Sequence, residues 1–285
     1  MEVTVPDDKV GIALRLGLYV FLAVAGLMFF PVLLYWSGTG LLITSVLGTF
    51  GAAALANTIA IRVFERRGLA DIGLGWPPGS ARNLLIGVVA GIGAALLVLL
   101  PPLIARAATM QRDTTQASGW PSLLFVTILL IFGAVSEEML FHGYAFQLLV
   151  SKFGVYATIL PISVLFAFAH SKNANLSWLG LINTFGFGVV LGYAMVRTGD
   201  LWTAIGIHFG WNWVLPLFGV NLSGFTIGVT GFTMRWSVGD LWSGGQYGPE
   251  GSLLTCGVIV ALLVYLHRAP VQKQETFLLQ ARQEA

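Results

Sequence analysis

Residues 121–150 read PSLLFVTILLIFGAVSEEMLFHGYAFQLLV. The stretch is apolar almost throughout, but it carries two adjacent carboxylates, Glu137 and Glu138, and an imidazole, His142. A continuous helix of this length would measure about 45 Å, whereas the hydrocarbon core of a bilayer is roughly 30 Å thick. We therefore expect the helix to tilt, to break or to project into water. Ionisable groups inside a spanning helix are costly and indicate a functional site.

The rest of the chain has the same apolar character. Of its 285 residues, 56% are hydrophobic and 10% are charged, and the mean hydropathy is +0.81. Soluble domains contain about 25% charged residues, so a soluble fold is excluded, and so is a disordered chain. The net charge of +2 predicts no nucleic-acid partner, which would need basic residues clustered on one soluble face. The single cysteine, Cys256, allows neither an intramolecular disulfide nor a CxxC metal pair.

Eight stretches are long and apolar enough to be predicted as membrane helices. These are residues 12–36, 40–63, 83–105, 121–150, 154–170, 178–196, 201–218 and 252–267. They predict an all-α, polytopic transmembrane bundle in which residues 1–285 form a single membrane domain. Residues 219–251 are too polar to span and predict an outer loop, while residues 64–82 predict a basic inner linker.

The distribution of basic residues predicts the orientation. With the N-terminus inside, eleven Lys and Arg residues fall on inner segments and four on outer ones, as the positive-inside rule requires. We therefore expect both termini on the cytoplasmic side. The first residues, MEVTVPDDKV, lack the basic segment of a signal peptide, so we expect the first helix to be retained. The protein is expected in a bacterial or archaeal cell membrane.

Polar residues inside the predicted helices recur at a spacing of four. The pairs are Glu138 with His142, Phe166 with His170, and His208 with Asn212. Residues four apart share one face of a helix, whereas Glu137 lies about 100° around the helix from Glu138. One carboxylate can therefore face a site while the other supports the structure. Gly206 and Gly210 bracket His208 and favour close helix packing.

These groups suit the hydrolysis of an amide bond. A carboxylate beside an imidazole can take a proton from water, and imidazole and amide N–H groups can donate to a developing oxyanion. One Glu and two His residues are also a common zinc ligand set, although the contiguous HExxH signature is absent. We expect no cofactor and keep zinc as a minor alternative.

At these residues the chain resembles the CPBP family of CAAX proteases and bacteriocin-processing enzymes, also called the Abi family. That family has three motifs, EExxxR, FxxxH and HxxxN. They correspond here to EEMLFH from Glu137, FAFAH from Phe166 to His170, and HFGWN from His208 to Asn212. The resemblance covers about residues 120–218, the expected catalytic core, and His142 stands where the family has Arg.

The resemblance implies an intramembrane glutamic-type protease. Glu137 would be the general base, with His170 helping to activate water, and His208 and Asn212 would hold the oxyanion. Three residues are expected to support the site, namely Glu138, His142 and Phe166. The implied substrate is a peptide or membrane protein, including a lipidated one, that is reached within the lipid bilayer.

Two other functions remain open at this point. The polar cluster could bind a partner in a non-enzymatic immunity or scaffold protein, and His142 in place of Arg favours this alternative. Buried Glu and His residues also build proton relays in transporters, but the chain shows no internal repeat of the kind common in transporters.

Overall fold

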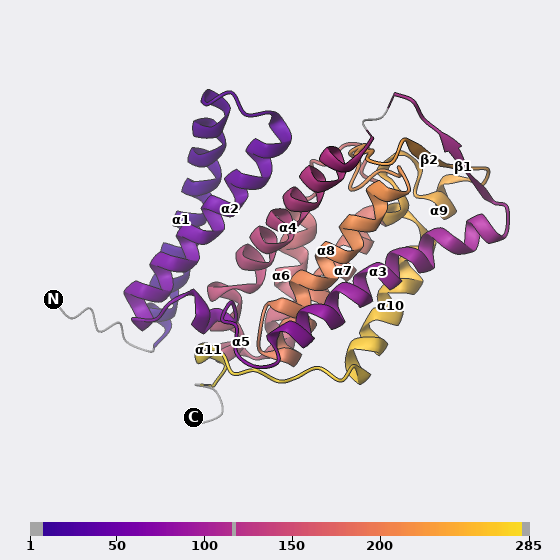
Figure 1. The fold of residues 1–285 in the computed structure, drawn as a ribbon. Helices are drawn as coiled ribbons and strands as arrows, with labels where there is room; N and C mark the ends of the chain where they lie inside the picture. The colour runs from indigo at the N-terminus through magenta and orange to yellow at the C-terminus, as the bar shows by residue number, and fades with distance from the viewer. Residues whose placement is uncertain (1–7, 116–117, 281–285) are drawn as a thin grey trace.

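The computed structural model describes residues 8–115 and 118–280, and within them the fold is mostly helical (Figure 1). Residues 1–7 lie outside the described residues. The expectation that the first helix is retained rests partly on them. The helices and strands are α1 (Lys9–Trp36), α2 (Leu41–Ala60), α3 (Ser80–Ile104), β1 (Ala108–Arg112), α4 (Trp120–His142), α5 (Tyr144–Phe153), α6 (Val155–Ala169), α7 (Trp178–Thr198), α8 (Trp202–Leu217), β2 (Phe232–Trp236), α9 (Asp240–Ser243), α10 (Leu253–Arg268) and α11 (Phe277–Gln280).

Five helical segments of the described chain are long and apolar enough to cross a membrane. They are α1, α2 with its π-helical extension to Glu65, α3, the segment Trp120–Phe153 and α7. Two further apolar helices, α6 and α10, are shorter. These helices support a multi-pass helical membrane protein. The number of helices long enough to span is five, however, and not the eight that the sequence predicts. The predicted span at 201–218 is α8, a helix of 16 residues that is largely buried within the bundle.

Helices α1 and α2 form a hairpin on one side of the bundle (Figure 1). A charged contact joins the two helices of this hairpin, because Arg15 on α1 lies 3.2 Å from the Glu65 carboxylate at the end of the α2 extension. The Tyr144 hydroxyl, at the start of α5, donates to the same carboxylate at 2.9 Å. The hairpin is therefore tied to the segment that follows Glu137 and Glu138.

Helices α3 and α8 pack backbone to backbone. A Cβ atom on Gly206 would lie 2.6 Å from the Leu84 carbonyl oxygen, and one on Gly210 would lie 2.6 Å from the Val88 carbonyl oxygen. Only glycine allows this approach without a shift of α3. His208 lies two residues beyond Gly206, about 200° around the helix, so it faces away from α3. The two glycines therefore determine which face of α8 is turned toward α4.

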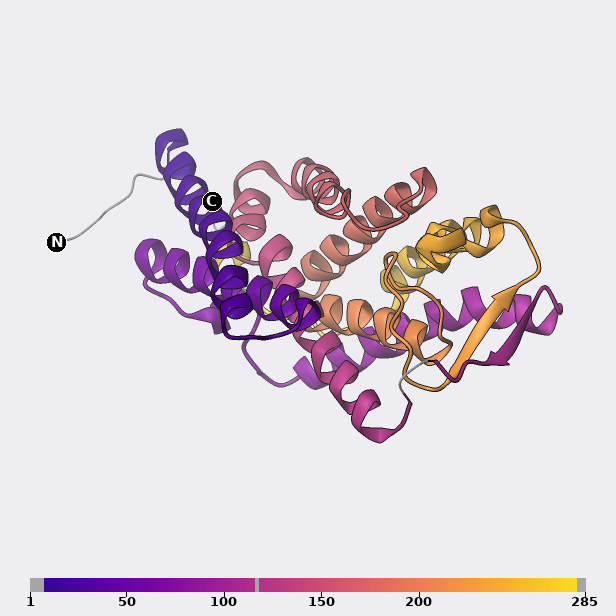
Figure 2. The same ribbon diagram turned by 90° about the horizontal axis from the view of Figure 1, so that it is seen from above.

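The segment 219–251 contains no helix long and apolar enough to span a membrane, but it contains structure that the sequence did not indicate. Strand β2 within it pairs antiparallel with β1, with Ala108 opposite Trp236 (Figure 2). Helix α9 and two short 3-10 turns complete the loop. The loop is thus held against the segment between α3 and α4.

The first turn of α1 and the short helix α11 lie at the same end of the bundle (Figure 1). Between α10 and α11 the chain runs across this end, and Asn83 exchanges hydrogen bonds with the backbone of Gln272 at 2.7 and 2.8 Å. Further along, the Gln274 N–H donates to the Thr198 carbonyl at 2.6 Å, and Leu278 is buried. Whether this end faces the cytoplasm stays a prediction.

Candidate active site

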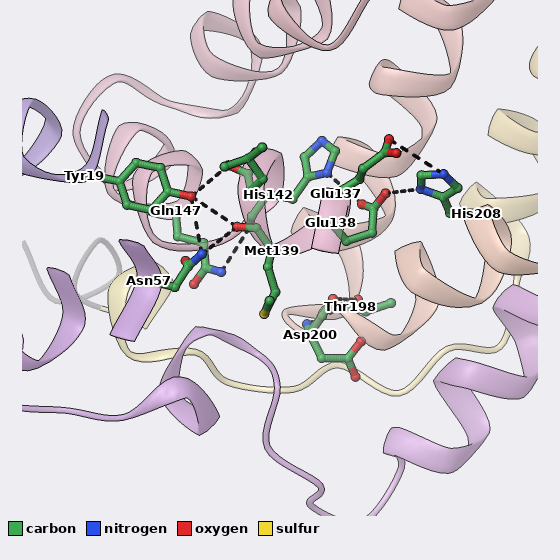
Figure 3. Close-up of polar contacts among 11 residues, drawn as sticks. Tyr19, Asn57, Glu137, Glu138, Met139, His142, Gln147, Thr198, Asp200 and His208 are labelled. Atoms are coloured by element: carbon green, nitrogen blue, oxygen red, sulfur yellow. Dashed lines mark hydrogen bonds and ion pairs between the residues drawn. The ribbon is translucent and has the colours of Figure 1, made fainter. Parts of the chain in front are cut away.

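Helix α4 turns its two adjacent carboxylates in different directions (Figure 3). The Glu137 side chain keeps 30% of its surface exposed, whereas that of Glu138 is fully buried. The sequence predicts that neighbouring carboxylates diverge, and the structure shows which one reaches open space. Glu137 is the carboxylate that a water molecule or a substrate can contact.

Glu138 holds two histidines. Its Oε2 atom lies 2.8 Å from His142 Nδ1 and its Oε1 atom lies 2.7 Å from His208 Nδ1. Because an ionised carboxylate only accepts hydrogen bonds, both rings donate through Nδ1–H. The His208 ring is thereby oriented with Nε2 directed at Glu137, 3.9 Å from its Oε2 atom.

His170 reaches Glu137 from the C-terminal end of α6. Its Nδ1 atom lies 2.8 Å from the Phe166 carbonyl oxygen, so Nδ1–H donates there and Nε2 is left facing the site. The Nε2 atom lies 3.5 Å from Glu137 Oε2. The Phe166 ring is buried, with its centroid 4.7 Å from that of His170 and 6.3 Å from that of His208.

The polar groups open into a cavity of about 810 Å³. Glu137, His170, His208 and Asn212 all line it. Much of the remaining wall is apolar and comes from α2, α4 and α7, including Leu41, Leu42, Val46, Leu129, Leu130 and Leu191. The structure thus brings the four predicted site residues together at one cavity, and the predicted supporting residues Glu138, His142 and Phe166 lie directly behind or beside them.

The depth of His208 is explained by a break in α4. Counted along a continuous helix, His208 lies too near the inner end of its own helix to meet the carboxylates. The helix ends at His142, however, and α5 begins at Tyr144, so Glu138 lies five residues, about 7 Å, above the break. His208 lies six residues, about 9 Å, from the start of α8. The 2.7 Å contact between Glu138 Oε1 and His208 Nδ1 shows that the two side chains meet at one level.

One cavity residue, Glu250, has no counterpart among the predicted site residues. Its carboxylate accepts hydrogen bonds from the Ser223 N–H and, at 3.3 Å, from Trp211 Nε1 on α8. Burial raises the pKa of the Glu250 carboxyl, and these two hydrogen bonds partly offset the increase. A lone Glu in a polar loop carries no sequence signal, because only the fold of the loop places it against α8.

The zinc alternative depends on Glu137, His170 and His208. Within residues 8–115 and 118–280, no group of three or more His, Cys, Asp or Glu residues is arranged to hold a metal ion. A chelator experiment tests the alternative directly.

Residues 119–214 match the protein family described as type II CAAX prenyl endopeptidase, Rce1-like. The match runs from the residue before α4 into α8 and includes all three motifs, so the expected family resemblance is confirmed. No curated protein and no solved structure matches the chain. The helices α1, α2, α3 and α10 lie outside the matched segment.

Proposed function

Because residues 119–214 form a domain of the Rce1-like type II CAAX prenyl endopeptidase family, we propose that the protein is an intramembrane endopeptidase. It cleaves a peptide bond of a membrane-associated protein or peptide, including a lipidated one, in a bacterial or archaeal cell membrane. The observation that carries this proposal is the meeting of Glu137, His170, His208 and Asn212 at one largely apolar cavity. No nucleic acid and no cofactor are required.

In the proposed reaction Glu137 and His170 hold one water molecule at the cavity. Glu137 Oε2 and His170 Nε2 lie 3.5 Å apart, so a water on the cavity side of this pair contacts both side chains. Glu137 takes a proton as the water oxygen attacks the carbonyl carbon, and the protonated carboxyl later gives a proton to the leaving amine. His170 is oriented for this role by its hydrogen bond to the Phe166 carbonyl.

The negative charge that develops on the carbonyl oxygen needs donors on the opposite side. His208 and Asn212 lie one turn apart on the face of α8 that lines the cavity. A doubly protonated His208 ring donates through Nε2, and the Asn212 amide donates through Nδ2. Glu138 supports this arrangement because it fixes the orientation of His208 through Nδ1.

Substitution of Glu137 tests the proposal. The purified protein and the variants Glu137→Gln, His170→Ala, His208→Ala and Asn212→Ala are assayed in detergent with a library of fluorogenic membrane peptides. We expect Glu137→Gln and His170→Ala to abolish cleavage, and we expect losses of about 10²–10³-fold for removal of an oxyanion donor. Glu275→Gln, outside the cavity, is the matched control for the change of Glu to Gln. Full activity in a folded Glu137→Gln variant would contradict the proposal.

A strong zinc chelator, applied to the same preparation, separates the two mechanisms. Cleavage that persists with chelator and disappears in Glu137→Gln supports a metal-free glutamate peptidase. Cleavage lost to the chelator and restored by zinc assigns Glu137, His170 and His208 to a metal site instead.

A non-enzymatic immunity or scaffold protein is the alternative, and His142 in the position of the motif Arg is the observation that favours it. In that case the cavity binds a membrane partner without cleaving it. The test compares cells that lack the gene with cells that carry the Glu137→Gln variant. If the variant restores the phenotype that is lost on deletion, the binding alternative is supported. If it does not, the peptidase is supported.

A further inference from the structure

The break between α4 and α5 comes one residue after the motif that carries Glu137 and Glu138. In a continuous helix the Tyr144 N–H would donate to the Leu140 carbonyl. In the structure both groups have other partners, and both partners lie outside the matched segment. A backbone group left unpaired inside a membrane bundle would be strongly destabilising, so these partners are needed for the break to form.

Asn57 on α2 provides one of these partners. Its Oδ1 atom accepts from the Tyr144 N–H at 2.8 Å, and its Nδ2 atom donates to the Met139 carbonyl at 2.9 Å and to the Ala53 carbonyl at 2.8 Å. The side chain is fully buried. One side-chain amide therefore binds both sides of the break, the last turn of α4 and the first residue of α5. Figure 3 shows Asn57 with Tyr19 beside Met139.

Tyr19 on α1 provides the other partner. Its hydroxyl donates to the Leu140 carbonyl oxygen at 2.8 Å, and the Met139 carbonyl oxygen lies 3.2 Å away and shares the same hydrogen. Asn57 Nδ2 lies 3.4 Å from the same hydroxyl, so the two side chains form one connected polar unit. We call Tyr19 and Asn57 the break clamp.

Gly143 makes room for the break clamp. A Cβ atom on Gly143 would collide with Asn57 Oδ1 and with the Met139 carbonyl oxygen. The close approach of Asn57 Oδ1 therefore leaves no room for a side chain at this position.

The break clamp binds the carbonyl oxygens of Met139 and Leu140, which lie in the last turns of α4 close to Glu137 and Glu138. Met139 directly follows Glu138, and Leu140 lies one turn beyond Glu137, so a shift of these carbonyls moves both carboxylates. We propose that Tyr19 and Asn57 are positioning residues for Glu137 and Glu138. They fix the rotation and depth of the last turn of α4, and they make the α1–α2 hairpin part of the catalytic apparatus.

Tyr19→Phe and Asn57→Asp test the role with minimal change of shape. Tyr19→Phe removes only the hydroxyl. Asn57→Asp keeps an acceptor for Tyr144 but replaces two N–H donors with at most one O–H, so at least one of the Met139 and Ala53 carbonyls loses its donor. This prediction rests on the proposed peptidase activity. We expect kcat to fall about 5–10-fold in Tyr19→Phe and about 100-fold in Asn57→Asp, with KM within twofold of the wild-type value. The reason is that a displacement of the carboxylates by about 1 Å affects the reaction more than it affects substrate binding. Tyr265→Phe and Asn175→Asp, both on exposed side chains, are the matched controls and should keep wild-type kcat.

Nitrogen-15 NMR of the histidine rings tests the same proposal without any peptidase assay. The chain has four histidines, His142, His170, His208 and His267. In the clamp variants we expect the ring signals of His142 and His208, which report the contacts of Glu138, to shift while that of His267 stays unchanged. Single His→Gln variants assign the signals.

The two readouts separate the positioning role from the proposed function. If the wild-type protein cleaves nothing and the His142 and His208 signals still shift, the peptidase proposal fails and the clamp stands. Unchanged kcat together with unchanged histidine signals in a folded Tyr19→Phe protein would overturn the clamp. Should Asn57→Asp fail to fold, Tyr19→Phe alone decides the question in the same way.

Discussion

At the scale of single residues, the division of work between Glu137 and Glu138 follows from their environment. Adjacent residues on a helix point about 100° apart, so the two carboxylates cannot share one narrow face. Glu137 is partly exposed to the cavity, and Glu138 is buried between two imidazoles. The two glutamates are therefore suited to different roles. Glu137 can contact a substrate, and Glu138 orients His208.

His142 is engaged through one ring nitrogen. Its Nδ1 atom contacts Glu138 Oε2, while the buried Nε2 atom has no hydrogen-bond partner within the described part of the chain and lies 3.4 Å from where a Cβ on Gly192 would be. The role of His142 is therefore that of a single N–H donor, which an amide can also supply. An Arg would bring a longer side chain and a permanent charge to this place.

Replacement of His142 tests this role. We expect His142→Gln to retain activity within about threefold because its amide can donate to Glu138. His142→Leu leaves a buried carboxylate with one donor fewer, at a cost of about 1.5–3 kcal/mol, so kcat/KM should fall about 10–100-fold. His267→Leu, at an exposed position on α10, is the control. Equal activity of His142→Gln and His142→Leu would show that the hydrogen bond to Glu138 is irrelevant to the reaction.

At the scale of helices, the site is assembled by two local features. The break after α4 brings Glu138 to the depth of His208, and the glycine face of α8 against α3 turns His208 toward α4. Neither feature involves a reacting group. Both determine whether the three motifs meet.

The contact between α3 and α8 can be tested with a single methyl group. Gly210→Ala would place its Cβ 2.6 Å from the Val88 carbonyl oxygen, so α8 must shift away from α3. We expect a lower melting temperature, with a loss of about 1–3 kcal/mol, and a fall in kcat because His208 and Asn212 move with α8. Gly93→Ala, on α3 where a Cβ meets nothing within 4 Å, is the control and should be neutral or slightly stabilising. Wild-type kcat and stability in Gly210→Ala would contradict the packing argument.

At the scale of the whole molecule, the loop 219–251 and the C-terminal segment lie at opposite ends of the bundle (Figure 1). Glu250 attaches the loop to α8 at the cavity, and the hydrogen bonds of Asn83 attach the C-terminal segment near the start of α3. The positive-inside rule predicts that the loop end faces outward and the C-terminal end faces the cytoplasm.

Cysteine labelling tests this orientation. In a Cys256→Ser background, we expect Ser237→Cys on the exposed outer loop to react with a membrane-impermeant maleimide in intact cells. Lys273→Cys, exposed on the C-terminal segment, should react only after the membrane is made permeable. The opposite pattern would invert the predicted topology, and labelling of both in intact cells would place the two ends on the same outer side.

The sequence by itself determined the helical membrane class, the three motifs and four of the residues that line the cavity, namely Glu137, His170, His208 and Asn212. It could do so because apolar length, a spacing of four residues and intramembrane charge are local properties that a linear pattern expresses directly. Only the tertiary structure decided that Glu137 and not Glu138 opens to the cavity, that α4 breaks at Gly143, and that Tyr19, Asn57 and Glu250 belong around the site. Those facts depend on contacts between segments dozens of residues apart, whose hydrogen bonds and close packing leave no periodic trace in the sequence.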